Sequence, residues 1–424
     1  MINKNKILVS HPTGNANVRA IIDTFNTSGV LQHFYTSIAT YPNNVWYKLS
    51  RIKPFYSFSR RTFSPQLEGY TRTHPWKELG RLLALKTGLK SLTKHETGIF
   101  CVDNIYKSLD MHVASKLDDE IKKGATAVYA YEDCALETFT KAKQLGLKCI
   151  YDLPIAYWET GRKLMQTEAE RMPKWAATLG GGIKDSKEKL LRKQKELELA
   201  DVVVGPGLFV LDSLPEWAKS KKRIMSPFGS PQSKNFIPKT DVDSSKPLRV
   251  LFVGSMGQRK GLGDLFAAMN ILKEKNANIE LVVLGSILAP MDFYKSEYPD
   301  FIYESSRPHD EVLKLMRSCD VFCLPSIVEG RALVMQEAMS QGLPLIITPN
   351  TGGEDLIIEG ETGFLVPIAS ADSIAQKLEW FLSNRHLIPQ MGINAYHLSQ
   401  KYTWAGYGNT VVDELRLYLN NSIN

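Results

Sequence analysis

Pro325-Ser-Ile-Val-Glu-Gly-Arg-Ala-Leu-Val-Met-Gln-Glu337 carries the strongest fold signal in this chain, and it follows the apolar run Val321-Phe-Cys-Leu324. The apolar run predicts a buried strand, and the residues from Val334 onward predict a helix. A strand that leads through a short, glycine-containing loop into a helix is the repeating unit of parallel α/β sheets. Because the first amides of a helix lack intrahelical partners and its dipole favours negative charge, this loop also predicts an anion site suited to a diphosphate.

The same alternation of apolar runs and helical stretches extends along most of the 424 residues. Strands are expected at 6–10, 127–131, 148–152, 201–205, 249–253, 279–284, 301–304, 321–325, 344–348 and 363–366. Helices are expected at 17–27, 135–145, 184–199, 263–275, 310–318, 334–341 and 371–383. Residues 226–246 are rich in proline, serine and glycine and read as a linker. The chain is therefore expected to be α/β, with two doubly wound Rossmann-like domains over residues 1–231 and 232–402 and a ligand site in the cleft between them.

Bulk composition excludes several classes of protein. Hydrophobic residues make up 43% and charged residues 23% of the chain, as in ordinary globular proteins. No apolar stretch approaches the roughly 18 residues of a membrane-spanning helix, and the run at 7–10 is too short for a signal peptide, so a cytoplasmic protein is expected. The cysteines are odd in number and scattered, which predicts neither disulfides nor a structural zinc site.

The net charge of +7 is concentrated in one segment. Between Arg51 and His95 there are ten lysines and arginines against two acids, together with several aromatic residues such as Trp76. Such a segment suits an anionic partner, which can be membrane headgroups, a phosphorylated lipid carrier or nucleic acid. A solvated basic face on a helical insert is the alternative.

Glu329 and Glu337 are the first candidates for chemistry. Glu329 lies on the loop at the strand end, and Glu337 lies about one turn into the helix. Carboxylates repel a diphosphate, so they do not serve as phosphate ligands. They are suited instead to accept hydrogen bonds from sugar hydroxyls, one from a ribose and one from a transferred hexose.

These two glutamates form E-x7-E in the context PSxxEGxxLxxxEAMxxGLPxI, followed by Thr351-Gly-Gly-Glu-Asp and Gly363-Phe-Leu-Val-Pro367. In these motifs the chain resembles the family-4 glycosyltransferases, which have the GT-B fold. The resemblance implies that Glu337 holds the donor ribose and that Glu329 acts catalytically by orienting the donor sugar. It also implies that the loop between them contacts the donor through Gly330, Arg331, Ala332, Leu333 and Val334.

The turn Val253-Gly-Ser-Met-Gly-Gln-Arg-Lys260-Gly261 follows another expected strand. A glycine-rich turn that contains a lysine is a natural phosphate contact. The family usually has a basic residue directly after the first glycine, where this chain has Ser255. Gly254 and Ser255 are therefore expected to contact the donor, while Lys260 and Arg259 are expected to stabilise the negative charge that develops on the leaving phosphate.

The first domain resembles the family through fewer residues. His11-Pro-Thr-Gly14-Asn15 ends the first expected strand, and in GT-B enzymes this loop approaches the donor phosphates and the acceptor. Gly14 is the donor-binding candidate there, and His11, Asn15, Asp152 and Tyr157 are expected to reach the cleft. The histidine that the family often places near residue 152 is missing. Residues 403–424 look like the family's final helix, which packs back on the first domain.

The resemblance implies a hexosyltransferase that moves a sugar, with retention of anomeric configuration, from a nucleotide-diphosphate sugar to a glycan or lipid-linked acceptor. It suggests a role in bacterial surface polysaccharide, capsule or lipopolysaccharide synthesis, without metal or other cofactor and without nucleic acid. With the basic segment 51–95 it predicts peripheral contact with the inner face of the plasma membrane. Two alternatives remain open: a GT-B nucleotide-sugar epimerase or hydrolase, and a catalytically silent nucleotide-sugar-binding subunit. A dinucleotide-dependent oxidoreductase is disfavoured because no G-x-G-x-x-G follows the first strand.

Overall fold

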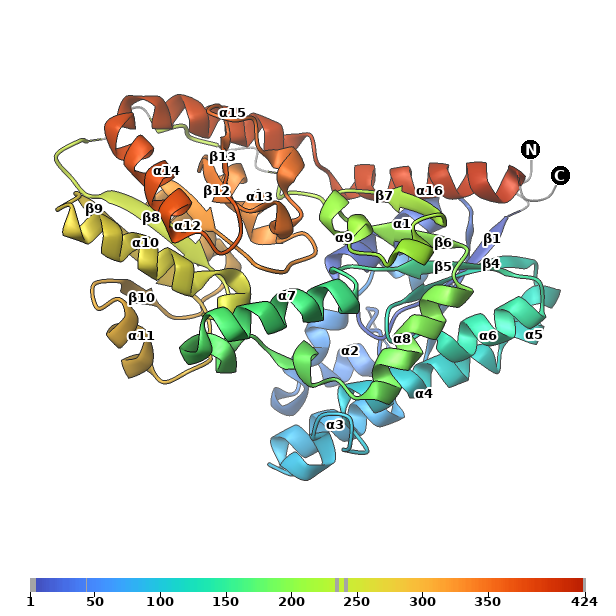
Figure 1. Ribbon diagram of the computed structural model, residues 1–424. Coiled ribbons are helices and arrows are strands. Elements are labelled where there is room, and N and C mark those ends of the chain that lie inside the picture. Colours follow the sequence, from blue (N-terminus) through green and yellow to red (C-terminus); the bar gives the residue numbers. More distant parts are fainter. Residues whose placement is uncertain (1–4, 43, 233–235, 240–242, 422–424) are drawn as a thin grey trace.

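The computed structural model describes residues 5–42, 44–232, 236–239 and 243–421, and these form two lobes built around parallel sheets (Figure 1). All strand pairs within both sheets are parallel. The expected fold class, two Rossmann-like α/β domains, is thereby confirmed.

The first sheet has the strand order β3-β2-β1-β4-β5-β6-β7. Its strands are β1 (Lys6–Ser10), β2 (Leu31–Thr36), β3 (Thr71–Thr73), β4 (Ala125–Tyr131), β5 (Lys148–Asp152), β6 (Val202–Gly205) and β7 (Lys222–Met225). The helices of this part are α1 (Ala16–Thr27), α2 (Val45–Leu49), α3 (Trp76–Lys86), α4 (Val102–Ala114), α5 (Leu117–Lys122), α6 (Leu136–Gln144), α7 (Trp158–Arg171), α8 (Lys187–Leu199) and α9 (Leu208–Asp212). Separate apolar clusters cover the two faces, with α1 on one face and α4 and α6 on the other.

The second sheet has the strand order β10-β9-β8-β11-β12-β13. Its strands are β8 (Leu248–Val253), β9 (Ile279–Leu284), β10 (Ile302–Glu304), β11 (Val321–Leu324), β12 (Leu345–Ile347) and β13 (Gly363–Leu365). The helices are α10 (Leu262–Glu274), α11 (Met291–Glu297), α12 (His309–Arg317), α13 (Leu333–Ser340), α14 (Ala371–Ser383) and α15 (Ile388–Gln400). The chain runs outward from β8 to β10 and then returns to the other side of β8 as β11. This reversal creates a topological switch point between the carboxyl ends of β8 and β11, where open α/β sheets bind ligands.

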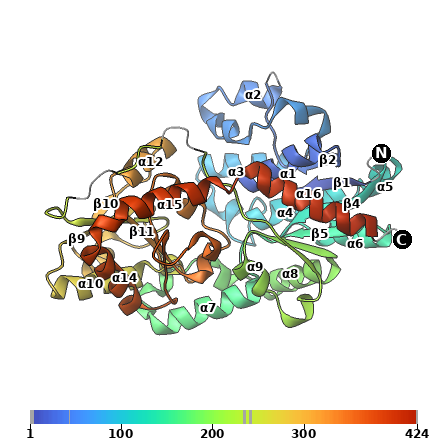
Figure 2. The same cartoon turned by 90° about the horizontal axis from the view of Figure 1, so that it is seen from above.

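The last helix, α16 (Trp404–Asn421), leaves the second lobe and lies along the first (Figures 1 and 2). Its Val411 and Leu415 are buried in the same apolar cluster as Ile21 of α1, and the Arg416 guanidinium donates to the Ser28 carbonyl at 2.9 Å. The two lobes are therefore joined by this crossing as well as by the segment near residue 231. The expected boundary between residues 231 and 232 stays a prediction.

A third connection between the lobes is absent from the sequence-based expectations. After β5 the chain runs through α7 and the 3-10 helix at Pro173–Thr178 toward the second lobe (Figure 1). Trp175 is 1% exposed there and packs among Phe266, Phe293 and Tyr294, inside the core of the second lobe. At the end of α7, Arg171 forms an ion pair with Asp264 at 2.7 Å. The excursion 158–178 therefore fastens the first lobe to the second.

None of the described helices combines the length and the apolar character that crossing a membrane requires.

Candidate active site

The two loops at the switch point of the second sheet bring the predicted catalytic side chains together. Lys260, on the loop after β8, places its Nζ 2.6 Å from Oε1 of Glu329, on the loop after β11. Arg259 Nη1 donates to the same oxygen and to the Val328 carbonyl, both at 2.9 Å. One largely buried carboxylate therefore balances two cations.

Glycine is required where these loops cross. Gly261 has φ +72°, and a Cβ there would lie 2.0 Å from the Pro325 carbonyl oxygen. The side chain of Lys260 lies across Gly254, whose added Cβ would be 2.6 Å from the lysine Cδ. Only a residue without a side chain permits both approaches. The glycine-rich turn thus directs Lys260 toward Glu329.

Helix α13 begins beside this cluster. Its N-cap is Ala332, and no side chain caps its first amides. The amides of Leu333 and Val334 stand in the first turn, where helix geometry supplies no intrahelical acceptor. The start of α13 therefore offers uncapped N–H donors and the positive end of a dipole to an anion.

Glu337 lies four residues after Leu333 and faces α12. Its Oε1 is 3.9 Å from Nδ1 of His309, the first residue of α12. Burial raises the pKa of the Glu337 carboxyl, and the nearby His309 opposes this shift. A half-buried carboxylate with spare acceptor capacity is suited to hydrogen-bond a hydroxyl pair such as that of a ribose.

A pocket of about 510 Å³ joins these groups. Eight of the predicted site residues line it: Gly254, Lys260, Glu329, Arg331, Ala332, Leu333, Val334 and Glu337. Four residues that were not predicted also line it: Val253, Arg307, His309 and Val312. Arg307 forms an ion pair with Glu304 at the carboxyl end of β10. The signal for Arg307 and His309 was present in the sequence, because Ser305-Ser-Arg-Pro-His309 directly follows an expected strand of the same sheet.

Three other predicted residues of this domain are not in the pocket lining. Arg259 lines a neighbouring pocket instead, where it still reaches Glu329. Gly330 contacts the first lobe, since an added Cβ would lie 1.7 Å from the Pro154 carbonyl oxygen. Ser255 lies between Gly254 and Met256 and is half-buried.

Arg331 contributes backbone rather than charge to the pocket. Its side chain is 0% exposed and forms an ion pair with Asp355 at 2.7 Å. It also donates to Gln336 Oε1 and the Gly352 carbonyl, and it lies over the Tyr402 ring. The guanidinium is therefore compensated inside the domain, and its expected contact with the donor stays a prediction.

The glycine loop of the first domain differs from the expectation. An added Cβ at Gly14 would lie 2.6 Å from Cζ of Phe63, so this glycine makes room for an aromatic ring. Asn15 is exposed at the start of α1, and its Oδ1 accepts from the Thr13 hydroxyl at 3.2 Å. His11 is buried against Tyr131, and burial lowers the pKa of His11 to about 3. His11 is therefore packed inside the first domain and does not reach the cleft as expected.

Asp152 and Tyr157 were expected in the cleft, and the structure corrects both placements. Tyr157 is fully buried in the apolar cluster that contains Tyr151. Asp152 is 2% exposed at the end of β5, and burial raises its pKa to about 7. Asp152 ends β5, a central strand covered on each face, and Tyr157 directly precedes α7 and packs into the cluster on one of these faces, so both side chains are buried inside the first domain.

Comparison with known proteins agrees with this geometry. Residues 233–398 match the family of glycosyl transferases group 1. The capsular polysaccharide biosynthesis glycosyltransferase CapM of Staphylococcus aureus is 29% identical over 150 residues. That match covers 34% of this chain and 39% of CapM, so this chain spans well under half of the length of that relative.

Solved structures match over nearly the whole chain. Sucrose-phosphate synthase from Thermosynechococcus elongatus has a TM-score of 0.64 at 17% identity, covering 98% of this chain and all of that one. Anabaena HepE in complex with UDP and glucose has a TM-score of 0.58 at 15% identity, covering 97% of this chain and 99% of that one. At these identities the likeness shows the fold, which is the two-domain GT-B architecture.

Proposed function

We propose that this protein is a retaining glycosyltransferase whose donor is a nucleoside-diphosphate sugar. The observation that carries the proposal is the pocket in which the uncapped start of α13, Lys260, Glu329 and Glu337 face one another. The amides and the lysine suit a diphosphate, Glu337 suits the ribose, and Glu329 suits the donor sugar. The group 1 match and the UDP-bound fold relative support the same donor class.

In the proposed reaction an acceptor hydroxyl oxygen forms a bond to the anomeric carbon while the bond from that carbon to the diphosphate oxygen breaks. The electron pair of the broken bond stays on the diphosphate. The acceptor proton passes to the leaving phosphate oxygen on the same face of the sugar, so configuration is retained without an enzyme nucleophile. Lys260 and the α13 amides stabilise the charge that develops on the leaving group, while Arg259 holds Glu329.

Lys260 pairs with Glu329 in this structure, which sets a condition for donor binding. A diphosphate carries more charge than one carboxylate and draws the lysine Nζ toward it. Glu329 is then released to accept from a sugar hydroxyl, with Arg259 remaining as its partner at 2.9 Å. We expect the cations and helix amides to suffice without a metal, so that turnover survives treatment with EDTA.

We further propose a glycan or lipid-linked acceptor at a membrane surface. Helix α3 and the turn after it expose Trp76 by 73%, Leu83 by 64% and Leu89 by 51%, next to the exposed lysines Lys90 and Lys94. Apolar anchors among cations suit an anionic interface. A role in surface polysaccharide synthesis is consistent with the printed function of CapM.

Calorimetric titration with UDP, GDP and ADP tests the donor site. One nucleotide should bind. Glu337→Ala should weaken its affinity at least tenfold, because the carboxylate that accepts hydrogen bonds from the two ribose hydroxyls is lost. Glu361→Ala, at an exposed glutamate of the same domain, is the matched control. No binding by any nucleotide to the folded wild type would overturn the donor-site assignment.

Turnover assays distinguish a glycosyltransferase from an epimerase, a hydrolase and a catalytically silent subunit. We expect nucleoside diphosphate to be released only when acceptor is added. The anomeric NMR coupling should be the same in the donor and in the product. Epimerised or hydrolysed donor without acceptor would instead indicate an epimerase or hydrolase. Binding without any turnover of donor would indicate a silent subunit.

Vesicle sedimentation tests the surface. The double variant Trp76→Ser/Leu83→Ser should lose most binding to phosphatidylglycerol-containing vesicles relative to phosphatidylcholine vesicles. Leu417→Ser, at a side chain 61% exposed on α16, should bind as the wild type does. Equal binding by all three proteins would remove α3 from the proposal.

A further inference from the structure

A second pocket, of about 220 Å³, lies between the lobes on the far side of Arg259 from the donor pocket. Its walls are α7, the segment around Leu179–Asp185, Lys193 of α8 and, from the second domain, Arg259 and Val328. Arg259 lines this pocket and donates to Glu329, which lines the donor pocket. A group held here therefore lies on the Glu329 side of the donor pocket, next to the residue assigned to the donor sugar.

The charges around this pocket are unevenly compensated. Lys193 lies 3.3 Å from Glu132 and 3.4 Å from Asp133, and Arg259 pairs with Glu329. Arg162 is half-buried on α7 and, within the part of the chain that the structure describes, has no carboxylate within 4.0 Å. A partly desolvated guanidinium without an anion is unfavourable, and its planar fork matches the geometry of phosphate.

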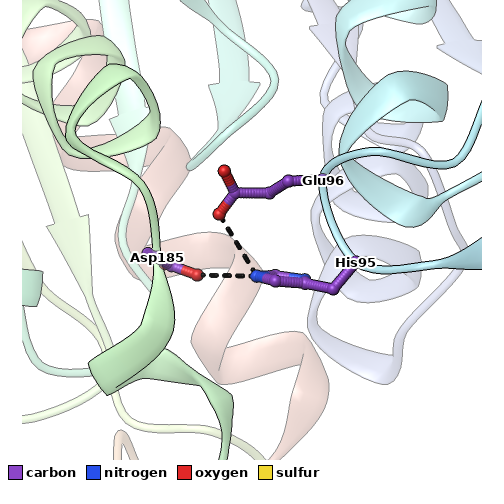
Figure 3. A group of neighbouring side chains, drawn as sticks. All are labelled: His95, Glu96 and Asp185. Atoms are coloured by element: carbon purple, nitrogen blue, oxygen red, sulfur yellow. Dashed lines mark ion pairs between the residues drawn. The ribbon is translucent and has the colours of Figure 1, made fainter.

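Asp185 is the one acid among the described residues that line this pocket, and its Oδ1 already has two partners. It accepts from Lys189 at 3.0 Å, and its Oδ1 is 3.2 Å from Nε2 of His95. Figure 3 shows His95 and Glu96 on one segment facing Asp185 on another. Glu96 in turn accepts from the Ser186 amide at 3.0 Å, so this group ties the pocket wall to the end of the basic segment. Lys189 contacts Asp185 Oδ1 and the Ser186 amide contacts Glu96 Oε1, so this group joins the two segments without forming an ion pair with Arg162.

We propose that this pocket is the acceptor subsite and that Arg162 binds a phosphate group carried by the acceptor. The proposal rests on the proposed glycosyl transfer and adds the chemical class of its second substrate. Ala156, Met165 and Val328 supply an apolar wall for the body that bears the phosphate. The phosphate can belong to a lipid carrier or to a sugar, since Arg162 recognises the group that both share.

Binding to the protein saturated with its tightest nucleoside diphosphate tests the subsite, because the donor anion site is then occupied. The probes are geranyl phosphate and glucose 6-phosphate, titrated into wild type, Arg162→Gln and Lys163→Gln. Lys163 is the exposed neighbour on α7 and matches the charge change. At least one probe should bind wild type, Arg162→Gln should weaken it tenfold or more, and Lys163→Gln should change it less than twofold.

The outcomes separate the sources and the two proposals. Preference for geranyl phosphate assigns a lipid-borne phosphate, preference for glucose 6-phosphate assigns a sugar-borne one, and equal binding shows that the phosphate alone is recognised. No binding of either probe, or equal losses in the two variants, overturns the subsite. Nucleoside diphosphate affinity, measured in the same variants, should stay within twofold of wild type. If no nucleoside diphosphate binds at all, the proposed function fails, and titration of the probes into the unsaturated protein still decides the role of Arg162.

Discussion

Trp175→Ala is expected to weaken the protein more than any surface change, because this side chain crosses from one lobe into the core of the other. Its ring centroid lies 4.8 Å from that of Phe293 and 5.8 Å from those of Phe266 and Tyr294. Its Nε1 donates to Glu297 at 3.0 Å. The excursion that carries it belongs in sequence to the first domain, so the substitution tests the docking of the two lobes.

The magnitude follows from burial. An aromatic side chain of this size removes about 200 Å² from water, which at about 25 cal/mol/Å² corresponds to about 5 kcal/mol as an upper bound. Truncation of buried aromatic residues to alanine generally costs about 3–5 kcal/mol of unfolding free energy. The lost hydrogen bond to Glu297 adds about 1 kcal/mol. We therefore expect a loss of about 4 kcal/mol from the second lobe and its contact with α7.

Urea unfolding followed by fluorescence and by hydrogen exchange of the second lobe measures this loss. Trp217→Ala is the matched control, because Trp217 is 46% exposed and its removal should cost less than about 1 kcal/mol. Hydrogen exchange is needed to follow the second lobe by itself, because a two-domain protein need not unfold in one step. Equal unfolding curves for the two variants would refute the inference that Trp175 anchors the excursion.

Three further predictions address the site and the first domain. Gly330→Ala should lower donor turnover strongly and raise the radius of gyration in solution scattering, because the added Cβ would lie 1.7 Å from the Pro154 carbonyl oxygen and push the lobes apart. Gly69→Ala is the control and should change neither quantity, since its Cβ would meet no atom within 4 Å. Glu329→Gln should bind nucleoside diphosphate severalfold more tightly while transfer falls, since the carboxylate no longer competes for the nearby cations; weaker binding would contradict the proposed exchange of partners. Asp152→Asn should match wild-type stability near pH 4 and exceed it near pH 8 by up to about 4 kcal/mol in urea unfolding. The raised pKa of Asp152 means that its contribution to the wild-type free energy of unfolding is lost as pH rises from about 4 to about 7. A difference between the two proteins that does not change with pH would contradict burial as the cause.

The second domain could be predicted almost completely from sequence. Its strands are short, β-branched runs with turn residues at their ends, and all six expected strands are present in the sheet. Local periodicity was less informative in the first domain. The expectations did not include β2, whose residues Leu31–Thr36 contain Gln32 and His33 within the run. His33 lies 2.5 Å from Glu120, so a tertiary contact compensates a polar residue that disfavoured a strand assignment.

The residues of the candidate site also differ in how well the sequence predicts them. Motif spacing identified the residues whose position depends on their own loop, such as Lys260 and Glu337. Motif spacing does not determine side-chain direction: Arg331 turns into the domain toward Asp355, and Tyr157 turns into the core of the first domain. It also missed the second pocket, whose walls come from α7, α8 and the second domain and meet only in three dimensions.

The anchored excursion constrains how the two lobes can move. A rotation about the segment near residue 231 and the crossing before α16 would pull Trp175 out of its aromatic surroundings unless the excursion 158–178 moves with the second lobe. The Arg171–Asp264 ion pair and the hydrogen bond from the Gln258 side chain to Glu168, at 2.6 Å, oppose that separation. If the excursion stays with the second lobe, the chain must bend after Tyr157, whose side chain is buried in the core of the first lobe. In that motion Arg162 and Arg259 would move together while Lys193 stayed with the first lobe, so the second pocket would open at the same time as Gly330 left Pro154.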